Sequence, residues 1–256
     1  MLDAVLFIGV PYLALVVLII GVLAKIGAWI SPRGLTSLAS VAVVSYNWSA
    51  GARAGEVLKR ILTFYTLKYT NDKLLYWGAL LFHWGIFLTL LLGHTALFFS
   101  PEQLAAMGID PSTRKIIAIG LGTLFGIVVV IGLILLWARR LTKPEVKSFT
   151  FADDWFALVL ITAIVLVGLV NTAVIHPHYD KTVTPWLQNL LTGNVAAALE
   201  AITKAEPLVK LHIFLAEVLM IYVPFGKMIH PFTIFFEPTI TSAPYKVSGS
   251  EVIFSK

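Results

Sequence analysis

The sequence predicts an all-α integral membrane bundle of five transmembrane helices. Of the 256 residues, 58% are hydrophobic and only 13% are charged, and the mean hydropathy is +0.88. Soluble domains are about 45–50% apolar and about 25% charged. Five stretches reach the roughly 20 apolar residues that a spanning helix needs, and none alternates in polarity as a membrane β-strand does. Composition therefore excludes a soluble globular protein, a disordered chain and a β-barrel.

The predicted spans form one transmembrane domain, residues 1–235, which is followed by a tail, residues 236–256. We expect the first span to be retained, because the chain begins Met-Leu-Asp without the basic segment of a signal peptide. Tryptophans near four predicted helix ends, Trp29, Trp77, Trp137 and Trp155, suit the membrane interface. In chain order the spans are residues 5–30, 75–99, 116–138, 155–174 and 208–230.

Basic residues are distributed unevenly between the two sides of this arrangement. Twelve of the 19 lysines and arginines lie in the loops after spans one and three and in the tail, and five lie on the opposite side. The positive-inside rule then predicts an amino terminus outside and a carboxyl terminus inside. The net charge of +5 thus indicates orientation and does not indicate nucleic-acid binding.

Two connecting segments are predicted to be helical. Apolar residues recur at helical spacing over residues 57–69 with basic residues between them, which predicts an amphipathic helix on the inner surface. Membrane anchoring and partner docking explain that helix equally well. On the outer side, Val195, Leu199 and Ile202 predict a short helix that caps the bundle.

The histidines are the main candidates for a functional site. The chain has no cysteine, so a redox cofactor would need histidine, methionine or carboxylate ligands. His83 and His94 are 11 residues apart, or three helical turns and about 16 Å. His212 and His230 are 18 residues apart, or five turns and about 27 Å. Because the two spans run in opposite directions, His83 and His230 are expected towards the inner face, and the other two towards the outer face.

Two cross-helix pairs at different depths fit two b-type haems, each held by one imidazole from either side. The unequal separations are reconciled by Pro224, which can kink the fifth span. Gly85 and Gly93 would remove side-chain bulk where a macrocycle presses on the second span. Hydrogen bonds between helices and a proton pathway are the alternative explanations of intramembrane histidines.

Three segments of the chain carry a resemblance: LFHWGIFLTLLLGH, RRLTKP and LHIFLAEVLMIYVPFGKMIHPF. They resemble a known family, the dihaem cytochrome b (gamma) subunit of membrane-bound respiratory nitrate reductases. They are also similar to the membrane subunit of heterodisulfide reductase and to the M subunit of the membrane complex linked to dissimilatory sulfite reductase. The resemblance covers about residues 5–235, and the ending FFEPTITSAPYKV is closer to the sulfur-metabolism relatives.

The resemblance implies five transmembrane helices with the amino terminus outside, in which helices two and five hold both haems. By position, His83 and His230 would ligate the iron of the inner haem, and His94 and His212 that of the outer haem. In that family the two histidines of the second helix are one residue closer together. Its quinone-site lysine falls near Thr113 here, beside Arg114 and Lys115.

The resemblance also implies a function in the cell membrane as one subunit of a respiratory complex. A quinone, expected to be of the menaquinone type, would exchange electrons near the outer haem, and an iron–sulfur subunit on the inner side would exchange them at the inner haem. The chain has few residues outside the membrane, so terminal catalysis would belong to partner subunits.

Other polar residues are candidates for quinone or proton chemistry. His176 and His178, in VIHPHYD after span four, could accept quinol protons, with Asp180 nearby, or could form a solvated turn. Arg114 and Lys115 could bind a quinone oxygen or reach the lipid headgroups. Glu217, inside span five, could transfer protons or form a buried hydrogen bond between helices.

Two further interpretations of the chain remain open. The first is a transporter of protons or a metal ion lined by the histidines and Glu217, although the chain has no internal repeat. The second is a passive membrane anchor. Gly122 and Gly126 form a GxxxG motif, which predicts close packing of the third span.

Overall fold

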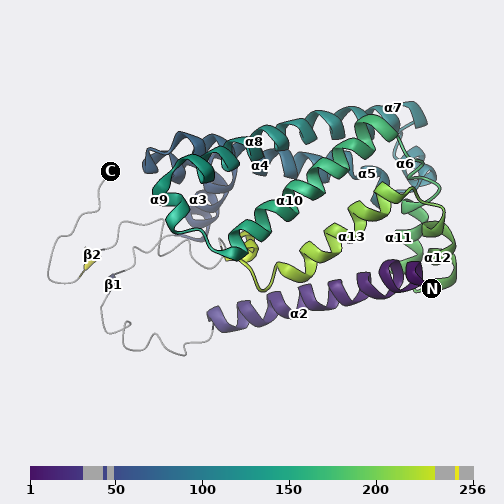
Figure 1. Cartoon of the computed structure of the whole chain (residues 1–256), viewed down its shortest axis with the longest axis horizontal. Helices are drawn as coiled ribbons and strands as arrows, with labels where there is room; N and C mark the ends of the chain where they lie inside the picture. The colour runs from purple at the N-terminus through teal and green to yellow at the C-terminus, as the bar shows by residue number, and fades with distance from the viewer. Residues whose placement is uncertain (31–42, 45–48, 234–245, 248–256) are drawn as a thin grey trace.

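Helices make up nearly all of the computed structural model, which describes residues 1–30, 43–44, 49–233 and 246–247 (Figure 1). Within these residues, β1 (Val43–Val44) pairs antiparallel with β2 (Lys246–Val247). The predicted tail, apart from β2, lies outside the described residues. Among the basic residues used for orientation, Arg33 and Lys256 also lie outside them.

Four continuous helices are long and apolar enough to span a membrane, and they coincide with the first four predicted spans, with ends that differ by at most six residues. They cover Leu2–Ala28, Lys73–Gly93, Ser112–Thr142 and Ala152–Ile175. Large apolar side chains on these helices, such as Leu91 and Ile134, are exposed, as a lipid-facing surface requires. Each of these helices contains one π-helical segment, so each is divided into two or three elements. The first consists of α1 (Leu2–Ala4), η1 (Val5–Gly9) and α2 (Val10–Ile30), and the second of α4 (Lys73–Leu88) and η3 (Thr89–Gly93). The third consists of α7 (Pro111–Lys115), η4 (Ile116–Leu121) and α8 (Gly122–Thr142), and the fourth of α10 (Ala152–Val170) and η5 (Asn171–Ile175).

The predicted fifth span is not one regular helix. Here α13 covers only Pro207–Tyr222, 16 residues, which rise about 24 Å, less than the roughly 30 Å of a hydrocarbon core. The helix ends just before Pro224, which has no N–H to continue the hydrogen-bond ladder. A turn, η6 (Lys227–Ile229) and α14 (His230–Thr233) follow. The prediction of five whole turns between His212 and His230 was therefore wrong, and Pro224 breaks the helix where a kink was expected.

Glycines bring α4 and η3 against α8. A Cβ added at Gly132 would lie 2.5 Å from the Phe82 nitrogen, and one at Gly93 would lie 2.9 Å from the Cα of Gly122. The GxxxG motif is thereby confirmed as a packing motif, because Gly122 contacts Gly93 and Gly126 contacts α10. Gly85 also faces α8, at Val129. The prediction that Gly85 and Gly93 leave room for a macrocycle was wrong.

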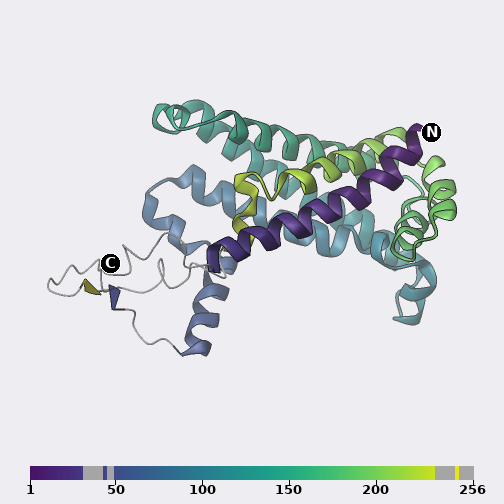
Figure 2. The ribbon, with the colours of Figure 1, turned by 90° about the horizontal axis from the view of Figure 1, so that it is seen from below.

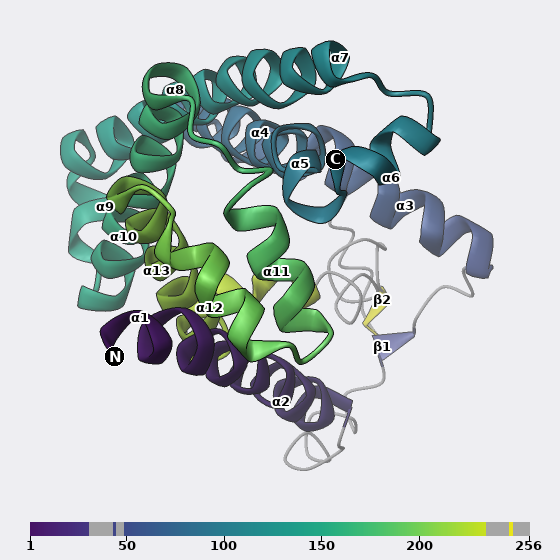
Figure 3. The ribbon, with the colours of Figure 1, turned by 90° about the vertical axis from the view of Figure 1, so that its right-hand side faces the viewer.

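Short helices cover the end of the bundle that holds the amino terminus (Figure 3). The predicted helix around Val195 is α12 (Val195–Thr203), and it packs against α11 (Val183–Leu191), which the sequence analysis missed. The Trp186 indole of α11 donates to the Phe7 carbonyl at 2.7 Å. We call this the outer end and the opposite end, where α2 stops, the inner end, following the predicted orientation.

The remaining connections are short. The predicted inner amphipathic helix is α3 (Ala50–Thr63), which begins earlier than expected and stops where Phe64 adopts a left-handed conformation with φ of 49°. Its last predicted turns form instead a 3-10 helix, η2 (Tyr65–Thr70). Three other short helices are α5 (Thr95–Phe98), α6 (Pro101–Ala106) and α9 (Pro144–Ser148).

Candidate functional site: two histidine pairs and an outer cavity

The four intramembrane histidines form two pairs, one towards each end of the bundle. The ring centroids of His94 and His212 are 6.2 Å apart, with 27° between the ring planes. Those of His83 and His230 are 5.8 Å apart, with 81° between the planes. The structure thus brings together the same partners that the depth argument paired.

Each histidine ring is held by a hydrogen bond to a backbone carbonyl. A carbonyl only accepts, so each Nδ1 donates, and in a neutral imidazole this arrangement leaves Nε2 as the nitrogen with a free lone pair. Such outer hydrogen bonds orient imidazoles that ligate metals. The four contacts, at 2.7–3.0 Å, are His83 to Ala79, His94 to Thr89, His212 to Ile164 and His230 to Lys227.

The ring spacings fit a metal ion between two imidazoles. Such rings have centroids about 6 Å apart, because a metal–nitrogen bond is about 2 Å long and the nitrogen lies about 1 Å from its ring centroid. Both pairs match this spacing. Over the described parts of the chain, no three histidine or carboxylate side chains gather into a larger metal-binding group. The donors present therefore fit a metal that takes two axial imidazoles, as a haem iron does.

Backbone geometry places the outer pair. The π-helical η3 ends in a hydrogen bond from the His94 nitrogen to the Thr89 carbonyl, five residues back, at 3.1 Å. The separation of His83 from His94 is therefore not the three regular turns that the sequence predicts. On α10, Gly168 lies against His212, and a Cβ there would be 2.7 Å from the His212 Cε1 atom. Only glycine lets this ring approach α10, a contact that the sequence analysis missed.

Two aromatic rings contact His83 of the inner pair. The His83 ring centroid lies 4.9 Å from that of Phe64 and 5.1 Å from that of Phe82. Phe64 is the left-handed residue that ends α3, so the turn after α3 covers His83. His230 is exposed at the start of α14.

Two clusters of ion pairs connect neighbouring helices and segments at the inner end of the bundle. Asp72 caps α4 and accepts hydrogen bonds from Arg139 at 2.8 Å and Lys143 at 2.9 Å, which ties α4 to the end of α8. Burial raises the pKa of Asp72, but the hydrogen bonds from Lys143 and Arg139 outweigh it and lower the pKa to about 2. In the second cluster, the Lys227 ammonium lies 2.8 Å from Asp154 of α10. The Lys227 carbonyl also holds His230, so this ion pair anchors the segment that bears His230.

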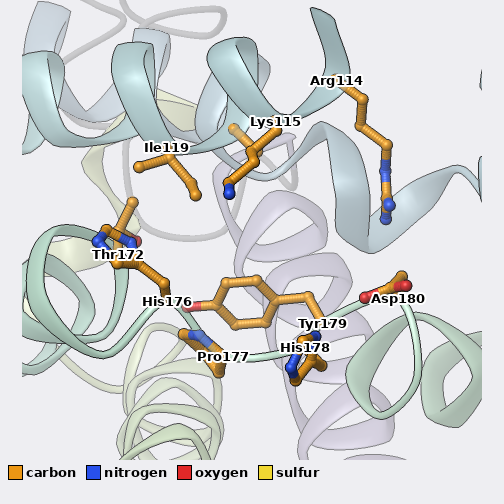
Figure 4. Close-up of a pocket in the computed structure, with 10 residues that line it drawn as sticks. Arg114, Lys115, Ile119, Thr172, His176, Pro177, His178, Tyr179 and Asp180 are labelled. Atoms are coloured by element: carbon orange, nitrogen blue, oxygen red, sulfur yellow. The ribbon is translucent and has the colours of Figure 1, made fainter. Parts of the chain in front are cut away.

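A cavity of about 260 Å³ opens at the outer end (Figure 4). Four of the five residues predicted for quinone or proton chemistry line it, and Lys115 points into it while Arg114 points towards Asp180. The Arg114 Nε is buried and has no hydrogen-bond partner among the described residues. The lining comprises Arg114, Lys115, Ala118, Ile119, Thr172, His176, Pro177, His178, Tyr179 and Asp180.

Residues 176–180 form one wall of this cavity, and they are placed there by the turn that ends η5. His176 ends this π-helix in a left-handed conformation, φ 53°, and its nitrogen donates to the Asn171 carbonyl at 2.9 Å. Pro177 prevents the helix from continuing. Tyr179 and Thr172 also line the cavity, and the sequence analysis missed both. Burial raises the pKa of the Tyr179 phenol, and its hydrogen bond with Thr172 lowers it by less.

Glu217, the fifth candidate, does not line this cavity. Its side chain is 4% exposed on α13, and neither carboxylate oxygen has a hydrogen-bond partner among the described residues. The expected hydrogen bond between helices is therefore not formed within the described structure.

Known proteins match this chain over most of its length. A family model described as nitrate reductase gamma subunit matches residues 63–247. The Hdr-like menaquinol oxidoreductase cytochrome b-like subunit of Archaeoglobus fulgidus is 27% identical, over 93% of this chain and 80% of that protein. The nitrate reductase gamma chain of Bacillus subtilis is 31% identical over 61% of this chain and 71% of that protein. The respiratory nitrate reductase 1 gamma chain of Escherichia coli is 27% identical over 59% of this chain and 68% of that protein. The chain therefore belongs to the nitrate reductase gamma subunit family, a family of membrane electron-transfer subunits.

Proposed function

We propose that this chain is a dihaem b subunit that exchanges electrons between a quinone at the outer end and an iron–sulfur partner at the inner end of a respiratory complex. The observation that supports it most is the geometry of the histidines. Two pairs have the spacing for bis-imidazole ligation, and in all four rings a backbone carbonyl occupies Nδ1, which leaves Nε2 available for a metal. When bound, each haem supplies a one-electron redox centre.

In this proposal His94 and His212 hold the outer haem, and His83 and His230 hold the inner one. The chain crosses the membrane five times, with its amino terminus outside. In the fifth crossing, the turn, η6 and α14 extend α13 far enough to place His230 beside His83. The basic residues at the inner end agree with this orientation.

The outer cavity is the proposed quinone site. Arg114 Nε offers a buried donor without a partner in the described structure, and Lys115 offers an ammonium that points into the cavity. Both can donate to a quinone oxygen. His176 or His178 accepts the proton that a quinol releases, because a neutral imidazole nitrogen can act as a general base. The name of the Archaeoglobus relative favours a menaquinone.

Glu217 is the proposed internal proton carrier. A carboxylate in an apolar bundle is costly to ionise, so it is expected to be protonated there. The same residue underlies the alternative function, a proton or metal-ion transporter. Haem content distinguishes the two functions.

The test is a reduced-minus-oxidised absorbance spectrum with extraction of haem from the purified full chain. Two b haems per chain are expected, and none would overturn the proposal. His94→Ala and His212→Ala should remove one and the same haem, and His83→Ala and His230→Ala the other. Loss of different haems within a pair would refute the pairing even if two haems are bound.

A further inference from the structure

The helix α3 is amphipathic along its whole second half. Ser49 caps it by accepting from the Ala52 nitrogen at 3.2 Å. At 100° per residue, the apolar residues Val57, Leu58, Ile61 and Leu62 occupy one side and the polar residues Glu56, Lys59, Arg60 and Thr63 the other. The helix therefore presents two chemically different faces.

The orientation of α3 differs from that of the spanning helices. It runs across the long axis of the bundle at the level where α2 ends (Figure 2) and projects sideways beyond α4 (Figure 3). Its carboxyl end is attached to the bundle, because the Trp84 indole of α4 donates to the Leu62 carbonyl at 2.9 Å. A helix so placed lies parallel to the plane of a membrane that the bundle spans.

The two faces of α3 also differ in their contacts. On the polar side Arg60 Nε lies 3.2 Å from Glu56, the Tyr65 hydroxyl donates to Glu56, and the Lys59 ammonium lies 4.3 Å from the Tyr65 ring centroid. On the apolar side Leu58 is 55% exposed and Leu62 41% exposed. Leu62 adjoins the exposed side of α4, because its carbonyl accepts from the Trp84 indole, and the Trp84 ring centroid lies 6.4 Å from that of the exposed Phe87.

We propose that α3 is an interfacial helix whose partner is the lipid surface at the inner face. Leu58 and Leu62 lie among the acyl chains, and Lys59 and Lys68 lie at the level of anionic headgroups. Interfacial helices of this kind lie in the membrane plane with an apolar face buried by about 5–10 Å and basic residues beside it. The continuity with the lipid-facing side of α4 and the orientation across the bundle favour lipid over a protein partner.

This assignment gives α3 a structural task. The residue after it, Phe64, rests on the His83 ring at 4.9 Å between centroids. Lipid contact along α3 therefore keeps Phe64 in position over the His83 ring.

Single-cysteine spin labelling tests the proposal directly, because the chain has no cysteine of its own. Leu58→Cys and Leu62→Cys place labels on the apolar face. The matched controls, Lys59→Cys and Thr63→Cys, place them on the polar face of the same two turns. The full chain is reconstituted in vesicles of neutral and anionic phospholipid. Relaxation by oxygen, which partitions into lipid, is compared with relaxation by a water-soluble nickel chelate.

The ratio of oxygen to nickel accessibility should be several-fold higher for the two leucine positions than for the two controls. Equal nickel accessibility at all four positions would overturn the proposal and would indicate a water-facing surface for a protein partner. High oxygen accessibility at all four would also overturn it, because the helix would then be fully inserted. Neither readout depends on haem or on electron transfer.

Discussion

The outer and inner histidine pairs have similar ring spacings but are held by different forces. The outer pair is fixed by helix packing, through the contact of Gly168 with His212 and the π turn before His94. The inner pair lies where α13 has already ended, and ion pairs and aromatic rings hold it. Substitutions that alter shape should therefore affect the outer pair, and substitutions that alter charge should affect the inner pair.

The largest expected effect comes from Gly168→Ala. The added Cβ would lie 2.7 Å from the His212 Cε1 atom, so the ring must leave its position. We expect loss of the outer haem and retention of the inner one, measured by haem extraction and absorbance. Gly9→Ala is the control, because nothing lies within 4 Å of its Cβ. Equal loss of both haems would contradict the independence of the two pairs.

Lys115→Met should weaken quinone binding in the outer cavity and leave both histidine pairs unchanged. Removing a charged donor from a quinone oxygen costs about 1.5–3 kcal/mol. We therefore expect the KM for a quinol analogue to rise at least roughly tenfold, since about 1.4 kcal/mol is a factor of ten. Both haem spectra should be unchanged. Lys181→Met is the control, because Lys181 lies on the same side but does not line the cavity. An unchanged KM would place the quinone elsewhere.

Asp154→Asn should disturb the inner pair alone. It removes the carboxylate that anchors Lys227, whose carbonyl holds His230. We expect the inner haem signal to shift in electron paramagnetic resonance and the outer signal to stay in place. The loss of stability should be small, because Lys227 is largely exposed and such pairs are weak. Glu200→Gln, in the exposed pair with Lys204, is the control and should change neither signal.

The smallest expected effect is the pH dependence of the Asp72 cluster. The pKa of Asp72 in the folded chain is about 2, below its ordinary value of 3.8. A lowered pKa contributes stability that is complete above pH 4 and is lost as the pH falls towards 2. Asp72→Asn should therefore reduce the free energy of unfolding by about 1–2 kcal/mol at neutral pH and flatten its fall between pH 4 and 2. An unchanged slope would show that the cluster does not stabilise the inner end.

Hydropathy and spacing predicted the first four spans and the partners in each histidine pair. These features depend on composition and on helical period, which are visible in the sequence. The expectation failed at the fifth span, where a proline treated as a kink ends the helix and a 3-10 segment brings His230 to His83.

Contacts between distant segments could not be read in this way. Gly168 and His212 are far apart in the chain, and nothing local to Gly168 distinguishes it from a packing glycine. Likewise, the histidine rings donate to backbone carbonyls, and because every residue type has a carbonyl, the sequence does not mark these acceptors. The role predicted for Gly85 and Gly93 was wrong for the same reason, because both glycines pack against α8.

The π turn at Thr89–Gly93 has a consequence for how the length of this helix can change. A hydrogen bond that spans five residues accommodates one residue more than an α turn, so a helix can gain a residue there while both flanks keep their places. Deletion of one of the three leucines in this turn, Leu90, Leu91 or Leu92, would restore an α turn. Separations of ten and eleven residues between two histidines in the positions of His83 and His94 are thus interconverted by one insertion or deletion, which a single turn of the helix absorbs.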